Sequence, residues 1–148
     1  MGKKRRLSIK WGIMLVIVGF GVIQTEAYGQ SWNWKFFFSD SECDSFYDPS
    51  TVFRSPENIV RVWWKEVFKT KDALKSRGFT GSEYEKVAYQ INVSEIHCQK
   101  KEGRRIFFML CSESGESILC EFHRRKMEEW VPVHKVHPIG VLYWELCR

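Results

Sequence analysis

Two histidines near the C-terminus come closest to forming a metal site in this sequence. His134 and His137 stand three residues apart, and imidazole nitrogens are common zinc ligands. A structural zinc ion needs about four protein ligands, and no acidic or thiol side chain follows these histidines at ligand spacing. Pro138 also disrupts a helix at this point. We therefore interpret both residues as surface histidines and expect no metal.

Two acidic pairs are candidates for acid–base chemistry, because paired carboxylates can donate and accept protons. They are Glu83 with Glu85 and Glu128 with Glu129. Nothing marks either pair as lying in a buried cleft, and exposed charge is the usual reason for such pairs. The sequence also lacks a nucleophile–base set, the turn of a serine hydrolase and a phosphate-binding loop. We expect a protein that is not an enzyme and that needs no cofactor.

Thiols offer the remaining chemistry. The chain has five cysteines: Cys43, Cys98, Cys111, Cys120 and Cys147. No C-x-x-C spacing occurs, so a zinc ribbon or a dithiol redox centre has little support. In an oxidising compartment we expect at least one disulfide, and the odd number leaves one thiol free, modified or paired with another chain. Cys111 and Cys120 flank a predicted hairpin and could form a bridge, although a one-residue change of register would place them on opposite faces.

Tryptophans are the candidates for an interaction site. Trp32 and Trp34 are two residues apart, so they share one face of a strand. Trp63 and Trp64 are neighbours that face opposite ways, so one belongs in the core while the other can be exposed. We take Trp32, Trp34 and Trp63 as candidate interaction aromatics. An exposed patch of such rings would mark a partner site, whereas a covering helix would make them part of the core.

The first 29 residues have the order of a cleavable export signal. They open with a basic cluster of Lys3, Lys4, Arg5, Arg6 and Lys10. An uncharged apolar run over residues 11–23 follows, and it is shorter than the about 20 residues that a membrane-spanning helix needs. Ala27 and Gly29 have the small side chains of a signal peptidase site, so we expect the mature chain to begin at Gln30. A start at Tyr28 and a retained membrane anchor are the alternatives.

Removal of this segment changes the electrostatics of the chain. The full sequence has a formal net charge of +5 at pH 7. Residues 1–29 carry five basic side chains and one acidic side chain, so residues 30–148 retain only about +1. The remaining basic runs are interleaved with glutamates, which is typical of a solvated surface rather than of a phosphate-binding patch. We expect no nucleic-acid partner and no stable membrane span after cleavage.

Short β-rich runs dominate residues 30–148, a length that fits one domain. The predicted strands cover residues 32–38, 59–68, 84–98, 104–111 and 116–122. A β-bulge near Ser94 would absorb a slip in the apolar alternation, and Gly115 suits a tight hairpin. Residues 69–81 predict a short helix or ordered loop, and the apolar spacing after Pro138 predicts an amphipathic helix. The predicted fold is α+β: a single antiparallel β-sheet of about five to six strands with a C-terminal helix packed on it.

Several short motifs become familiar when they are taken in order. They are residues 47–50 (Tyr-Asp-Pro-Ser), residues 58–63 (Asn-Ile-Val-Arg-Val-Trp), residues 95–98 (Glu-Ile-His-Cys), a basic strand that opens at Arg104, and a terminal Leu146-Cys147. In this order and spacing they resemble the surface-adhesin protein E family, over roughly residues 32–147. Two departures are that His97 stands where the family commonly has an acidic residue, and that Cys43, Cys111 and Cys120 are additional.

The resemblance implies a single antiparallel sheet in a bacterial protein exported to the periplasm or the outer cell surface of a Gram-negative bacterium. The family pattern pairs the cysteine of the Glu-Ile-His-Cys strand with the one near the C-terminus, which here implies a disulfide between Cys98 and Cys147. Closure of that loop would stabilise the fold by about 4 kcal/mol in the chain-entropy model. The founding adhesin binds host matrix proteins, so the implied partner is an extracellular matrix or envelope protein. A homodimer is a further expectation.

Taken together, these features favour an exported, non-enzymatic binding module that contacts a protein or an envelope component. The alternative is a structural or stress-related cell-envelope protein without an external ligand, since a fold does not by itself specify a ligand. An exposed aromatic patch would favour the first function, and a mixed, patch-free surface would favour the second.

Overall fold

The computed structural model describes residues 31–122, 129–134 and 137–148. The predicted export signal over residues 1–29, its cleavage site and Glu128 lie outside these described residues. No helix of the described part is both long enough and apolar enough to cross a membrane.

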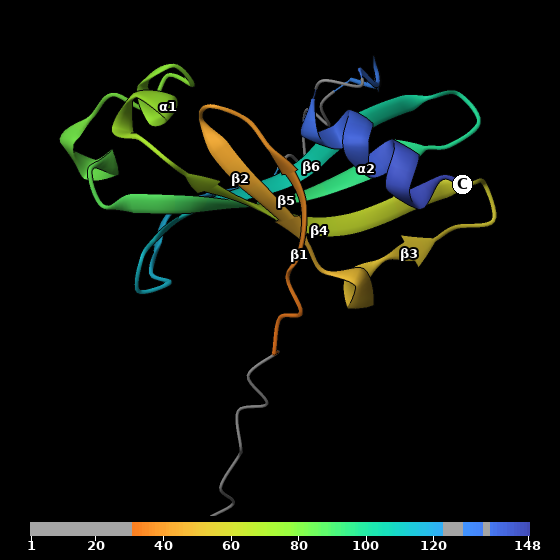
Figure 1. Cartoon of the computed structure of the whole chain (residues 1–148), viewed down its shortest axis with the longest axis horizontal. Coiled ribbons are helices and arrows are strands. Elements are labelled where there is room, and N and C mark those ends of the chain that lie inside the picture. Colours follow the sequence, from red (N-terminus) through yellow and green to blue (C-terminus); the bar gives the residue numbers. More distant parts are fainter. Residues whose placement is uncertain (1–30, 123–128, 135–136) are drawn as a thin grey trace, which may run out of the picture. The chain divides into compact units, whose positions relative to one another are not determined.

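The strands of the described part form one antiparallel sheet, shown in Figure 1. They are β1 (Lys35–Ser39), β2 (Cys43–Tyr47), β3 (Phe53–Arg54), β4 (Ile59–Phe68), β5 (Val87–His97), β6 (Glu102–Ser112), β7 (Ser117–Phe122) and β8 (Val131–Pro132). Six of them lie in the order β1-β2-β4-β5-β6-β7, while the two-residue strands β3 and β8 pair with β4 and β6. The helical elements are η1 (Pro49–Thr51), α1 (Lys71–Lys75), η2 (Ser82–Tyr84) and α2 (Pro138–Leu146). The predicted α+β class and the C-terminal helix are confirmed.

Strand β4 has the bounds that its alternation predicts, and it shows how the two faces of the sheet differ. Val60, Val62 and Trp64 are buried, whereas the intervening Arg61 and Trp63 are exposed or half-buried. Successive side chains of a strand point to opposite faces, so the alternation assigns one face of β4 to a core. The β5–β6 register shifts between Val93 and Ser94, where the sequence predicts a bulge, but the extra residue is Ile106 of β6 rather than a residue of β5.

Helix α2 covers one end of this buried face (Figure 1). Its Leu142, Tyr143 and Leu146 form a core cluster with Tyr47, Val60, Val62, Trp64 and Ile96. Pro138 at the start of α2 presets the helical backbone, as the sequence predicts. Gly103 of β6 allows the close approach of the helix, since a Cβ atom on it would lie 2.6 Å from the Ile139 Cγ2 atom.

The segment around α1 covers the other end of the same face. The Thr70 hydroxyl caps α1 by accepting a hydrogen bond from the Ala73 amide. Leu74 then packs in a second cluster with Val87, Phe108 and Leu110, and Phe79 contacts its edge. Both α-helices therefore lie on one face of the sheet, as Figure 1 shows, and the opposite face has no α-helix from the described residues.

A disulfide joins Cys98 to Cys147, with the two Cα atoms 5.4 Å apart. This is the pair that the family resemblance implies. It ties the end of α2 to the residue that follows β5, and the Arg54 guanidinium donates a further hydrogen bond to the Leu146 carbonyl. The C-terminal helix is thus fastened to the sheet covalently as well as by packing.

The second bridge considered above, between Cys111 and Cys120, is not formed in this structure. Cys43, Cys111 and Cys120 are all free thiols. The register of the hairpin is the reason: Cys120 lies opposite Met109, and the pairing shifts between Leu110 and Cys111, so that Cys111 lies opposite Ser117. The two thiols are therefore diagonal rather than direct neighbours across the strands.

Candidate interaction face

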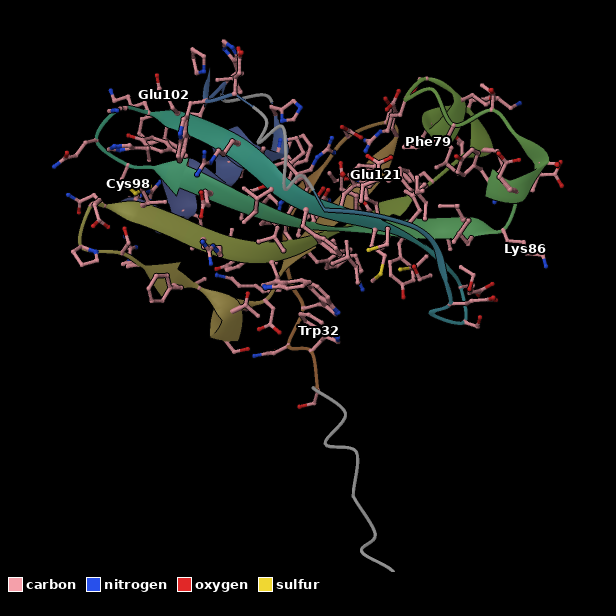
Figure 2. All side chains as sticks on the ribbon, turned by 180° about the vertical axis from the view of Figure 1, so that it is seen from behind. Trp32, Phe79, Lys86, Cys98, Glu102 and Glu121 are labelled. Carbon is pink, nitrogen blue, oxygen red and sulfur yellow. A yellow bond between two sulfur atoms is a disulfide. The ribbon has the colours of Figure 1, made fainter. Side chains whose placement is uncertain are left out.

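The sheet face on which the described residues place no α-helix is lined by aromatic side chains. Trp63 and Lys65 of β4 point to it, because their neighbours Val62, Trp64 and Glu66 are buried on the helix side. The strand register and the ring contacts place the remaining rings on it. We define the aromatic face as Trp32, Trp34, Phe36, Phe46, Trp63, Tyr89 and Phe107. In Figure 2 the labelled Trp32 lies on the opposite side of the sheet from Phe79, which belongs to the helix side.

Four rings of this face form a continuous row. Trp32 stacks on Trp34 with ring centres 4.9 Å apart, and it lies 5.6 Å from the ring of Trp63. Trp63 in turn lies 5.7 Å from Phe107, and these two residues flank Val93 from the neighbouring strands. Val93 is buried as a result. The three tryptophans singled out from the sequence are therefore brought together, and each remains half-buried.

The segment that carries Trp32 and Trp34 is held against the sheet by Asp48. One carboxylate oxygen of Asp48 accepts a hydrogen bond from the Asn33 amide at 3.0 Å, and the other accepts from the Ser50 amide and hydroxyl. Burial raises the pKa of Asp48, but these hydrogen bonds together hold it below its usual value. The ionised carboxylate therefore positions the two tryptophans before the first strand begins.

Lys65 lies among the rings of this face. Its Nζ atom is 4.8 Å from the centre of the Trp34 ring, 5.4 Å from that of Phe46 and 5.6 Å from that of Tyr89. Such distances are typical of cation–π contacts. Burial lowers the pKa of Lys65 below its usual value. Among the ion pairs of the described residues none involves Lys65.

A second charged group borders the face near its other end. Each carboxylate oxygen of Glu95 accepts two hydrogen bonds from one arginine: Oε1 from Arg61, at 3.1 and 2.6 Å, and Oε2 from Arg104, at 2.9 and 2.6 Å. Burial raises the pKa of Glu95, but the two arginines lower it by more, so the carboxylate stays ionised. One carboxylate with two guanidinium groups leaves a net positive charge, and Lys65 adds another. These four charged groups together therefore carry a net positive charge.

Some apolar rings of this face are open to solvent. Phe36 is 54% exposed, and Phe53, which lies beside the aromatic face because it pairs with Arg61 from β3, is 59% exposed. Exposed phenylalanines beside half-buried tryptophans are typical of a surface that another molecule covers.

The sequence identified only part of this face. Alternation along β4 puts Trp63 and Lys65 on the same face. Phe46 was missed because β2 has no clear alternating pattern, and Phe107 was missed because its face depends on the bulge opposite Val93 and Ser94. The signal that could have found them is that β2 and β6 each carry an aromatic side chain at these positions, Phe46 and Phe107.

The described residues that the sequence offered for chemistry lie on the surface. His134 and His137 are exposed, as are Glu83, Glu85 and Glu129, while Glu128 lies outside the described residues. The described residues contain no group of three or more potential metal ligands.

In comparisons with known proteins, no protein family model, curated protein or solved structure matches the chain.

Proposed function

We propose that this protein is an exported, non-enzymatic binding module that contacts a protein partner through the aromatic face. The observation that carries this proposal is the row of tryptophan rings on a sheet face that no α-helix of residues 31–122, 129–134 and 137–148 covers, beside the exposed Phe36. Aromatic side chains bury large areas at little cost in conformational entropy, and they are enriched where proteins bind each other.

The charge of the face suggests the chemistry of the partner. Lys65 is partly desolvated among three rings and has no carboxylate beside it in the described part of the chain. A partner that places a carboxylate over Lys65 and apolar side chains over the surrounding rings would complement this surface. We therefore propose a protein partner with an acidic residue inside an apolar docking surface.

We also propose the family of the protein and its location in the cell. The resemblance to the surface-adhesin protein E family supports an envelope or extracellular matrix protein as partner, in the periplasm or at the outer cell surface of a Gram-negative bacterium. The disulfide between Cys98 and Cys147 is consistent with an oxidising compartment. A structural envelope protein without an external ligand is the competing function.

Site-specific photo-crosslinking tests the proposal. We would place a benzophenone side chain at Phe36 on the aromatic face, and in a control protein at Trp144 on α2, which is also exposed. In cells that produce the protein naturally, we expect one dominant protein adduct from position 36, absent from position 144. The additional substitution Lys65→Glu should abolish the adduct.

The mass of the adduct distinguishes the occupants. An adduct of twice the mass of the chain would assign the face to a second copy, and a larger or smaller protein would be the external partner. Equal labelling from positions 36 and 144, or no adduct from either, would contradict a binding role for this face and favour the structural alternative.

A further inference from the structure

A cleft on the helix side of the sheet is separate from the aromatic face. It has a volume of about 760 Å³ and lies between the segment that follows α1 and the start of α2. Its lining includes Glu66, Gln90, Arg77, Phe79 and Ile139. Sites for small ligands are often such concave regions, with a few polar groups among apolar walls.

The floor of this cleft is polar where a core would be apolar. Glu66 is 4% exposed and Gln90 is 1% exposed, and Asn92 beside them is fully buried. On the same face of β4, the positions beneath α2 are Val60 and Val62. Burial of a carboxylate costs free energy unless it is paired, and apolar side chains of similar size are often as stable or more stable. Glu66 is paired with Arg77, but packing alone does not require a carboxylate at position 66.

The hydrogen bonds of Glu66 occupy one of its two oxygens. Oε2 accepts from the Arg77 guanidinium at 3.0 Å and from the Asn92 side-chain amide at 3.4 Å. Gln90 in turn donates to Asn92 at 2.5 Å. Within the described residues, Oε1 of Glu66 has no hydrogen-bond donor. A carboxylate oxygen can accept two hydrogen bonds, so Glu66 retains capacity for a ligand.

The charged and aromatic residues that line the cleft indicate the charge of its ligand. Among the described residues it holds three carboxylates, Asp40, Glu42 and Glu66, against two guanidinium groups, Arg77 and Arg105. Aromatic walls come from Trp64, Phe79 and Phe108. A net negative charge and aromatic rings both favour a cation with an apolar stem.

We propose that this cleft binds an organic cation, an amine or a guanidine on a short aliphatic chain, with its charged end at Oε1 of Glu66. The same chemistry occurs in free aliphatic amines and in the lysine or arginine side chains of a peptide. The site lies on the opposite face from Lys65, so its occupancy does not depend on the function proposed for the aromatic face.

Titration calorimetry and NMR with defined probes test this site. The probes are putrescine and agmatine as free amines, an arginine residue blocked at both ends as the peptide form, and acetate as an anionic control. We expect saturable binding of the cations and none of acetate. A free amine that binds better than the blocked arginine would identify the source as a metabolite, and the reverse order would identify a peptide.

A matched pair of variants assigns the binding to Glu66. Glu66→Gln should weaken cation binding by at least about tenfold, as expected when a charged partner is removed from a desolvated contact. Glu95→Gln also removes a buried carboxylate held by arginine, but on the other face, and should leave the affinity within about twofold.

NMR of the unaltered protein tests the site even if Glu66→Gln does not fold. The indole N–H resonance of Trp64, which lines the cleft, should shift on addition of the cation, whereas that of Trp63 on the aromatic face should not. Absence of saturable binding, equal shifts of both indoles, or unchanged affinity in Glu66→Gln would overturn the proposal.

Discussion

The ammonium group of Lys65 lies 4.8 Å from the centre of the Trp34 ring, although the two residues are 31 positions apart in sequence. Trp34 precedes the first strand, and Lys65 lies in the middle of β4. Their contact holds a cation within an aromatic surface, and the cation lacks a carboxylate partner in the described part of the chain. The charge is therefore better suited to recognition than to the stability of the isolated fold.

The substitution Lys65→Met separates these two roles. Methionine keeps an unbranched apolar stem among the rings and removes the desolvated charge. Because burial lowers the pKa of Lys65, the fold disfavours its charged form, so we expect the melting temperature of the variant to be no lower than that of the parent protein. Crosslinking from position 36 should be lost. A folded variant that retains the crosslink would show that the lysine takes no part in recognition.

Glu95 should make stability depend on pH. Burial raises the pKa of Glu95, but the hydrogen bonds and charges of Arg61 and Arg104 lower it by more, so that the pKa lies below the ordinary 4.5. A carboxyl group with a lowered folded-state pKa contributes stability above its unfolded-state pKa, and this contribution is lost as the pH falls through the folded-state value. The difference in unfolding free energy between the parent and Glu95→Gln should be about 1–2 kcal/mol at pH 7. This is less than for a fully buried ion pair, because Arg61 is half exposed and solvent screens its charge.

Urea unfolding at several pH values measures this difference, which should shrink below a pH of about 4.5. Glu145→Gln is the control, since Glu145 pairs with Lys35 on the surface and should contribute less than about 1 kcal/mol. A difference for Glu95→Gln that stays constant down to acid pH would show that the charge of Glu95 does not stabilise the fold.

Removal of the disulfide should destabilise the protein strongly. The bridge closes a loop with a sequence separation of 49, and the chain-entropy model assigns about 4 kcal/mol to a loop of this length. We expect the double variant Cys98→Ser with Cys147→Ser to lose about that free energy of unfolding in urea. Cys120→Ser, which removes an exposed free thiol, should change it little. Equal stability of parent and double variant would mean that packing alone fastens α2.

The three free thiols should differ in reactivity. Burial raises the pKa of the Cys43 thiol to about 12, despite the nearby Arg77, and burial also raises the pKa of Cys111. The thiolate is the reactive form, so both should be inert to iodoacetamide at pH 8 in the folded protein. Cys120 is exposed and should be alkylated first. Peptide mapping with and without denaturant measures the order, and early alkylation of Cys43 would contradict its burial.

The contact between Gly103 and Ile139 should tolerate no added atom. A Cβ atom at position 103 would lie 2.6 Å from Ile139 Cγ2, so Gly103→Ala should force α2 away from the sheet and cost about 1–3 kcal/mol. Shortening the opposing side chain with Ile139→Ala should cost less in the Gly103→Ala background than in the parent. Thermal unfolding of the four proteins forms a double-mutant cycle, and additive effects would show that the two residues do not oppose each other.

Local patterns in the sequence predicted much of the fold correctly. Alternation gave the bounds of β4, Gly115 takes the positive φ of 89° that the predicted hairpin needs, and Pro138 begins α2. Strand β2 was missed because its Cys43–Tyr47 segment lacks clear alternation, and it is a strand because β1 and β4 pair with it on both sides.

The sequence by itself determined the features that depend on a few neighbouring residues. These are the strands, the turns, the start of α2 and the shared face of Trp63 and Lys65. Only the tertiary structure decided which face of the sheet the two described α-helices cover, and that Trp34, Phe46 and Tyr89 meet around Lys65. It also decided that Glu66 and Arg77 share a cleft and that Cys120 lies opposite Met109. The physical reason is that each of these relationships depends on the register and order of separate strands, and a one-residue shift in pairing reverses the face of every side chain.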